Sequence, residues 1–271
     1  MSGGKKGKKG AARFRLFFAG IALLLALACL APEFPVYRLT QAGVSVYYSR
    51  GRKARAEEAL VQSRAYLAEM DSWLTGQEGE SRPGPQEASA GVNVVLGGPQ
   101  PLSNMGNRRR TAGYYWQGIV VICDPEGENP PLSHELAHWH LEKAAGGEKL
   151  PRWFSEGYAQ YAEYRLTGFA LPLTDGVAQA GVPGADLPGG LSLTGLDPLF
   201  EQESTQLTAY YLSFRAFNAL LEETGWPGIA LILEQLNQGA TFEDAFLSAT
   251  GLDFCRWERK ISSYFVEIPL E

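Results

Sequence analysis

One stretch of the chain, residues 132–164, holds most of what can be inferred about its fold and chemistry: LSHELAHWHLEKAAGGEKLPRWFSEGYAQYAEY. Apolar residues at helical spacing run through both of its ends, which predicts two buried helices. Gly146-Gly147 separates them, because paired glycines end helices. Pro151 favours the start of the second helix, since proline suits the first helical turn. The sequence therefore predicts two consecutive helices joined by a short connection.

The two predicted helices carry a candidate metal site. His134 and His138 are two of only three histidines, and four residues apart on a helix they lie on one face, where both imidazoles can reach one ion. Glu156 on the second helix can be the third ligand, which leaves a position open for water, as in catalytic zinc sites. Glu135 is placed to take a proton from that water. We expect one zinc ion per chain and hydrolysis by the activated water. The alternative is an exposed histidine pair beside a charged residue.

Residues 153–164, WFSEGYAQYAEY, resemble the second zinc motif of the gluzincin metallopeptidases, which include the zinc aminopeptidases and the bacterial peptidase MA-like metallohydrolases. The resemblance is specific over 134–164 and weaker elsewhere. It implies a thermolysin-like pair of active-site helices, zinc on the same three residues, and Glu135 acting on the metal-bound water. A metzincin is excluded, because Leu141 and Ala144 stand where its glycine and third histidine would be.

The resemblance also implies roles around a substrate cleft. Tyr210 aligns with the transition-state tyrosine of the aminopeptidases, where its hydroxyl could donate to an oxyanion, although it could equally pack under its helix. Gly113 and Tyr114 lie on a predicted strand, 113–123, that in gluzincins pairs with an extended substrate. Aminopeptidases carry a glutamate there that holds the substrate amino terminus. This strand has no acidic residue, which favours endopeptidase action.

A few other residues near the motifs have two interpretations each. Glu163 is either a carboxylate that orients a ligand imidazole or a surface glutamate. His140 is rotated by about 200° from His138 on the helix and is expected to point away from the metal, as a structural or surface residue. Cys123 and Cys255 could pair in an oxidising compartment, or each could be a small buried apolar residue.

The N-terminus has the pattern of an export segment. Six of the 24 lysines and arginines lie in the first 15 residues, and an uncharged apolar run, 16–31, follows. That run is shorter than the roughly 20 residues that span a bilayer comfortably, so cleavage after Ala28 and retention as an anchor both remain open. In either case the body is exported to the cell envelope, as a membrane-anchored or a secreted or periplasmic protein. The remaining 18 basic residues face 30 acidic ones, which argues against nucleic-acid binding.

The remaining pattern predicts an α+β fold. We expect a small mixed sheet with the active-site helix pair and a helical C-terminal half, preceded by an N-terminal hydrophobic helix. The expected strands are 44–48, 92–96 and 113–123. The further expected helices are 52–74, 208–223, 227–237, 241–249 and 253–265. The expected units are a signal or anchor segment, an α+β zinc-binding catalytic subdomain and a mostly helical subdomain, at 1–34, 35–167 and 168–271.

These features together predict an exported or membrane-anchored zinc metallopeptidase that acts on a peptide or protein substrate. One alternative is a non-catalytic binding or scaffold protein with structural zinc, although such sites usually have four protein ligands, often cysteines. Neither Cys123 nor Cys255 lies within the motifs, which favours an open site. Another alternative is a zinc hydrolase that acts on a non-peptide amide, for instance in cell-wall material. The sequence gives no oligomeric state.

Overall fold

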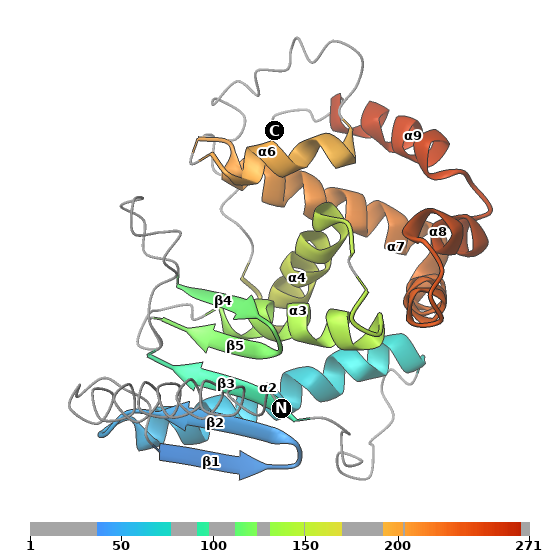
Figure 1. Ribbon diagram of the computed structural model, residues 1–271. Coiled ribbons are helices and arrows are strands. Elements are labelled where there is room, and N and C mark those ends of the chain that lie inside the picture. Colours follow the sequence, from blue (N-terminus) through green and yellow to red (C-terminus); the bar gives the residue numbers. More distant parts are fainter. Residues whose placement is uncertain are drawn as a thin grey trace, which may run out of the picture.

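A computed structural model describes residues 37–76, 91–97, 112–123, 131–148, 150–169, 192–202 and 204–266. These residues form a mixed α+β structure with one five-stranded sheet, so the predicted fold class is confirmed at that level (Figure 1). The predicted N-terminal apolar segment, 16–31, lies outside the described residues. Among the helices that the structure does describe, none is both long enough and apolar enough for a membrane span.

The sheet has the strand order β1-β2-β3-β5-β4. The pairs β2·β3 and β3·β5 are parallel, whereas the outer pairs β1·β2 and β4·β5 are antiparallel. Because β4 is last in the strand order, it forms one edge of the sheet. The strands are β1 (Tyr37–Gln41), β2 (Val44–Tyr48), β3 (Val92–Leu96), β4 (Gly113–Trp116) and β5 (Ile119–Ile122). The predicted strands 44–48 and 92–96 are confirmed, while β1 was not predicted.

The single strand predicted over 113–123 is wrong. The chain instead turns back at Gln117 and Gly118, so that β4 and β5 form a hairpin. Both turn residues have positive φ, 47° and 83°, which is the backbone conformation of a two-residue type I′ turn. The apolar run of β5 is therefore an interior strand, and β4 with its aromatic residues lies at the sheet edge.

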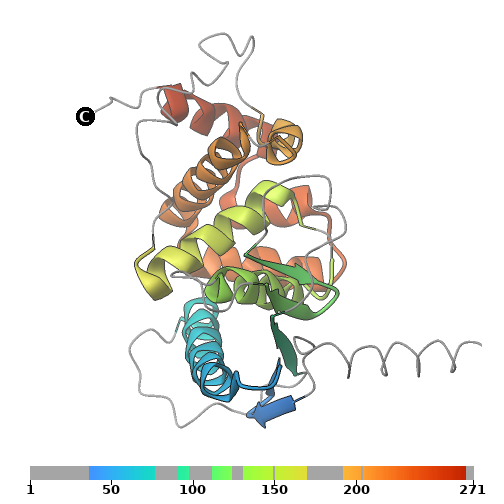
Figure 2. The same ribbon diagram turned by 90° about the vertical axis from the view of Figure 1, so that its left-hand side faces the viewer.

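Two helices next to one another cover the sheet. Helix α2 (Lys53–Thr75) packs on β1 and β2, and α3 (Leu132–Ala144) packs on β4 and β5 and against α2. Helix α4 (Arg152–Thr167) follows α3 and packs against it. In Figures 1 and 2, α3 and α4 lie between the sheet and the C-terminal helices. The two helices predicted within 132–164 are confirmed.

The C-terminal half is helical, as predicted. Its longest helix, α7 (Gln206–Asn237), has a non-helical residue at Gly225 (φ 63°), so two predicted helices form one kinked element. It packs along α4, so α4 is covered on two sides. The other C-terminal elements are the 3-10 helix η2 (Leu193–Leu196) and the helices α6 (Asp197–Phe200), α8 (Phe242–Thr250) and α9 (Phe254–Val266).

Aromatic residues fill the space between α4 and the C-terminal helices. Trp153 on α4 stacks on Phe254 and Trp257 of α9, and Tyr158 packs edge-on against Phe217 of α7. All five side chains are buried, which fixes α4 relative to the helical half.

The possible disulfide between the two downstream cysteines is not formed. Cys123 follows β5 in the sheet, whereas Cys255 lies on α9 in the helical half, and Figure 1 shows these elements far apart. Cys123 is half-buried, which is closer to the alternative of a small apolar residue, and Cys255 is exposed.

Candidate metal centre

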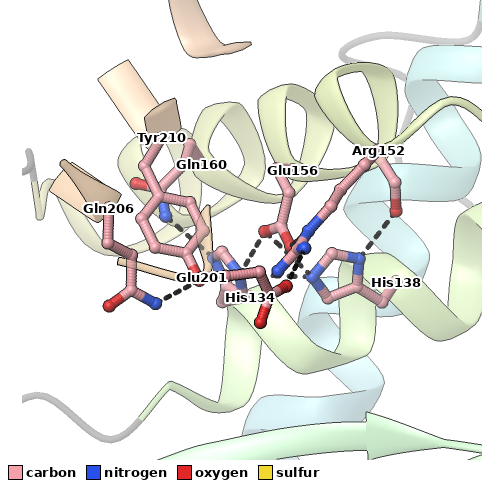
Figure 3. A network of polar contacts seen from close by, with 9 residues as sticks. His134, His138, Arg152, Glu156, Gln160, Glu201, Gln206 and Tyr210 are labelled. Carbon is pink, nitrogen blue, oxygen red and sulfur yellow. Dashed lines mark hydrogen bonds and ion pairs between the residues drawn. The ribbon is translucent and has the colours of Figure 1, made fainter. Parts of the chain in front are cut away.

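The predicted ligands come together on α3 and α4. His134 and His138 lie one turn apart on α3, and their Nε2 atoms are 3.2 Å from each other. Glu156, in the second turn of α4, points its Oε2 atom at both rings, at 3.5 Å from His134 Nε2 and 3.6 Å from His138 Nε2 (Figure 3). The three residues therefore lie close enough to bind one metal ion.

The spacing of these atoms fits a zinc ion. A tetrahedral ion with bonds of about 2.0–2.2 Å separates its ligand atoms by about 3.3–3.6 Å, and the three distances here are 3.2, 3.5 and 3.6 Å. Glu156 Oε2 is buried and makes no well-aligned hydrogen bond to a described residue. A buried carboxylate oxygen in that state is costly, and a cation held by all three atoms would satisfy it.

The carboxylates control the charge of the metal-free site. Burial alone would lower the pKa of His134, but the carboxylates of Glu156 and Glu163 raise it well above its ordinary value. Burial alone would raise the pKa of Glu156, but His138 and His134 hold it far below its ordinary range. In the metal-free protein, therefore, a proton on the imidazoles balances the buried Glu156 carboxylate.

The second nitrogen of each imidazole is held by a side chain from α4. Glu163 Oε2 lies 3.4 Å from His134 Nδ1, and Gln160 Nε2 lies 3.2 Å from the same atom. Ser155 Oγ lies 2.9 Å from His138 Nδ1. Such partners would fix each ring so that its Nε2 atom faces a bound ion. Glu163 is buried against His134, so its interpretation as a surface glutamate is wrong, and its position fits a carboxylate that orients this imidazole.

Ser155 and Gln160 were not identified from the sequence. Ser155 directly precedes the ligand Glu156, and Gln160 follows it by four residues, so both share the ligand face of α4. Polar residues at those spacings from a predicted ligand could have indicated them.

Glu135 lies beside the ligands. It is buried, at 7% exposure, and it lines the same cavity as the two imidazoles. Burial raises its pKa above the ordinary value of a glutamate, although His134 and His138 oppose the shift. A carboxylate whose pKa is moved toward neutrality is suited to accept a proton and to give it back.

The cavity in front of the ligands has a volume of about 690 Å³. Both predicted substrate-binding residues, Gly113 and Tyr114 on β4, line it, and so does Tyr210 on α7. A Cβ atom at Gly113 would lie 2.9 Å from the Val121 carbonyl oxygen and 3.3 Å from Glu135 Cγ. Only glycine therefore allows β4 to approach the start of α3 so closely.

Tyr210 packs at the metal centre from the helical half. Its ring is edge-on to the His134 ring, with centroids 6.3 Å apart, and Gln206 Nε2 donates to its hydroxyl at 3.3 Å (Figure 3). Burial, with a contribution from Glu156, raises the pKa of Tyr210 far above its ordinary value. The hydroxyl therefore keeps its proton and can act as a donor.

His140 points away from the ligands, as expected from its rotation on α3. Its Nδ1 atom is 2.8 Å from the Tyr158 hydroxyl, and its Nε2 atom is 3.1 Å from Asp71 Oδ1. The side chain is buried, so the structural interpretation is confirmed and the surface interpretation is wrong. His140 ties α3 to α2 and α4 behind the metal centre.

No protein-family model matches the chain, and no curated protein sequence matches it. The function is therefore inferred from the geometry of the centre and from the motifs within residues 134–164.

Proposed function

We propose that the protein is a zinc-dependent metallopeptidase of the gluzincin type, exported to the cell envelope or anchored there by its N-terminal segment. The observation that carries this proposal is the triangle formed by His134 Nε2, His138 Nε2 and Glu156 Oε2, with edges of 3.2–3.6 Å. Glu135 lies beside it in the same cavity. One zinc ion per chain is the metal that best suits two imidazoles and a carboxylate with an open fourth position.

Each side chain around the triangle has a separate role in the proposed amide hydrolysis. A bound zinc ion supplies a Lewis acid that lowers the pKa of water and polarises a carbonyl. Glu135 accepts the proton of the attacking water and then delivers it to the leaving amine. Tyr210 donates its hydroxyl proton in a hydrogen bond to the developing oxyanion. No covalent intermediate with the protein is needed.

The edge strand β4 supports a peptide as the substrate. Its outer side has no paired strand among the described residues, and Gly113 and Tyr114 line the cavity. An extended peptide can add to such an edge through main-chain hydrogen bonds. Because β4 and β5 carry no acidic residue to hold a free amino terminus, we propose endopeptidase action.

A purely structural zinc site fits less well. Among the described residues the ligand group has three members rather than four, and the buried Glu135 lines the cavity that this group faces. Closed structural sites complete the coordination of zinc with protein ligands.

The test is the variant Glu135→Gln, compared with Glu148→Gln at an exposed position beyond α3. Zinc content would be measured by elemental analysis, and turnover on a fluorogenic peptide library and on peptidoglycan fragments. We expect one zinc per chain in both variants, and a loss of turnover of about a hundredfold or more only in Glu135→Gln. Full activity of that variant would refute the role of Glu135. Turnover of the peptidoglycan fragments alone would redirect the proposal to a cell-wall amide.

A further inference from the structure

Arg152 occupies an unusual position in the cavity. It is the one lysine or arginine among the described residues that line the cavity, and the other charged lining residues, Glu135, Glu156 and Asp197, are acidic. The metal ligands and the general base account for two of these acids, whereas the chemistry of amide hydrolysis proposed above uses no arginine. The presence of the Arg152 guanidinium in the cavity therefore needs a separate explanation.

The guanidinium of Arg152 contacts one buried ring, one partly buried carboxylate and one exposed carboxylate. Its Cζ atom lies 4.3 Å from the centre of the buried Phe200 ring, and its Nε atom is 3.9 Å from Glu156 Oε1. Its Nη1 atom pairs with Glu201 Oε1 at 2.5 Å, where the Glu201 side chain is 71% exposed (Figure 3). Phe200 also packs edge-on against Tyr210, with ring centroids 5.2 Å apart. The arginine is thus fixed in place even without Glu201.

On the basis of the proposed peptidase function, we propose that Arg152 is a specificity residue that binds a carboxylate of the substrate, and that Glu201 occupies the same place until the substrate enters. The planar guanidinium fork matches a carboxylate with two parallel hydrogen bonds. An exposed ion pair is weak, so a substrate carboxylate can replace Glu201 at little cost. The pairing with Glu201 therefore indicates that the arginine binds a carboxylate.

The other charged residues that line the cavity are acidic, and they limit the preference for a substrate carboxylate to one substrate position. A carboxylate elsewhere in the cavity would face Asp197 or the metal-site glutamates, which repel it. We infer that the substrates are peptides with a single favoured acidic position next to the scissile bond, supplied by a Glu or Asp side chain or by a C-terminal carboxylate.

The experiment uses matched fluorogenic peptides and the full-length, zinc-loaded protein. One series moves a single Glu or Gln along both sides of the scissile bond, and a second series compares a free C-terminal carboxylate with an amide at the same distances. The variants are Arg152→Gln, Arg152→Lys and Glu201→Gln. The control is Arg165→Gln, at an exposed position near the end of the same helix.

At one position we expect the wild type to prefer the carboxylate about tenfold in kcat/KM, the range for a charged hydrogen bond at a partly exposed site. The ratio of kcat/KM for the carboxylate peptide to kcat/KM for its neutral counterpart should fall to about one in Arg152→Gln. It should be partly retained in Arg152→Lys and increase in Glu201→Gln. Arg165→Gln should match the wild type. The series in which the preference occurs, side chain or C-terminus, identifies the source of the carboxylate.

Two results would overturn the inference. An equal carboxylate preference in the wild type and Arg152→Gln would remove the arginine from recognition. An equal loss on all peptides, together with weaker zinc binding in a chelator competition, would show that Arg152 only positions Glu156. Failure of the proposed function gives a different result, since the zinc-loaded wild type would then cleave none of the peptides. In that case, fluorescence anisotropy of the same peptides would still show whether Arg152 selects a carboxylate.

Discussion

Helix α4 and the C-terminal helix α7 approach each other closely at Gly157, directly after the proposed ligand Glu156. A Cβ atom at this position would lie 2.3 Å from the Ser213 carbonyl oxygen and 2.7 Å from Phe217 Cβ. Ordinary contacts need about 3.4 Å or more, so Gly157→Ala must move the helices apart by about 1 Å. Both neighbours are fully buried, and neither can move aside alone.

We therefore expect Gly157→Ala to lower the free energy of unfolding by about 3 kcal/mol, at the upper end for overpacking of a core. For a chain of this size that corresponds to a fall in Tm of about 6–12 °C. A carboxylate displaced by about 1 Å no longer completes the ligand triangle, so zinc affinity should fall about tenfold or more. Urea unfolding of the metal-free protein, followed by circular dichroism, measures the first effect, and chelator competition measures the second.

Gly195→Ala provides the control for this prediction. A Cβ atom at Gly195 would have its nearest neighbour, Ser192 Cβ, at 3.6 Å, an ordinary contact, so its unfolding free energy should change by no more than about 0.5 kcal/mol. If Gly157→Ala were as stable as the control, the close packing of α4 on α7 would be wrong.

Three further predictions concern the metal centre. Because the pKa of His134 is raised in the metal-free protein, zinc binding near neutral pH should release about one proton and weaken as the pH falls, which calorimetry in buffers of different ionisation enthalpy measures. Tyr210→Phe should lower kcat about 10²- to 10³-fold with zinc retained, as steady-state kinetics and metal analysis would show. Its raised pKa also predicts no loss of wild-type rate from deprotonation of Tyr210 up to about pH 10. Glu163→Gln and Ser155→Ala should each weaken zinc binding by about 10- to 100-fold in chelator competition.

Each of these predictions has a result that contradicts it. Zinc uptake without proton release would show that His134 is neutral before the metal binds. Unchanged kcat in Tyr210→Phe would leave Tyr210 as a packing residue. Wild-type zinc affinity in both Glu163→Gln and Ser155→Ala would mean that the imidazoles need no support from α4.

Local patterns were enough to predict the grouping of His134, His138 and Glu156. The four-residue spacing of His134 and His138 depends only on helix geometry, and the glycine pair and Pro151 defined the ends of the two helices. Because the connection between the two helices is so short, α4 packs against α3 and Glu156 faces the histidines. The strands β2 and β3 were equally predictable, because their buried apolar residues alternate at the period of a strand.

The features that were missed depend on which strands and helices pair or pack with one another. The turn at Gln117 and Gly118 lies within a run of strand-forming residues, and only pairing of β4 with β5 reveals it. Strand β1 is mostly exposed and carries no core pattern, so it is defined by its partner β2. Arg152 was not singled out because its neighbours Phe200 and Glu201 are about fifty residues away and reach it only when α6 packs beside α4.

The concentration of functional groups on α4 has a practical consequence for engineering. This one helix carries the proposed third ligand, the side chains that hold both imidazoles and the arginine proposed to select the substrate. A substitution on α4 made to alter cleavage preference therefore risks the loss of the ion. Glu201, which directly follows α6, contacts only Arg152 among these groups, so libraries that aim to redirect selectivity should vary the segment around it.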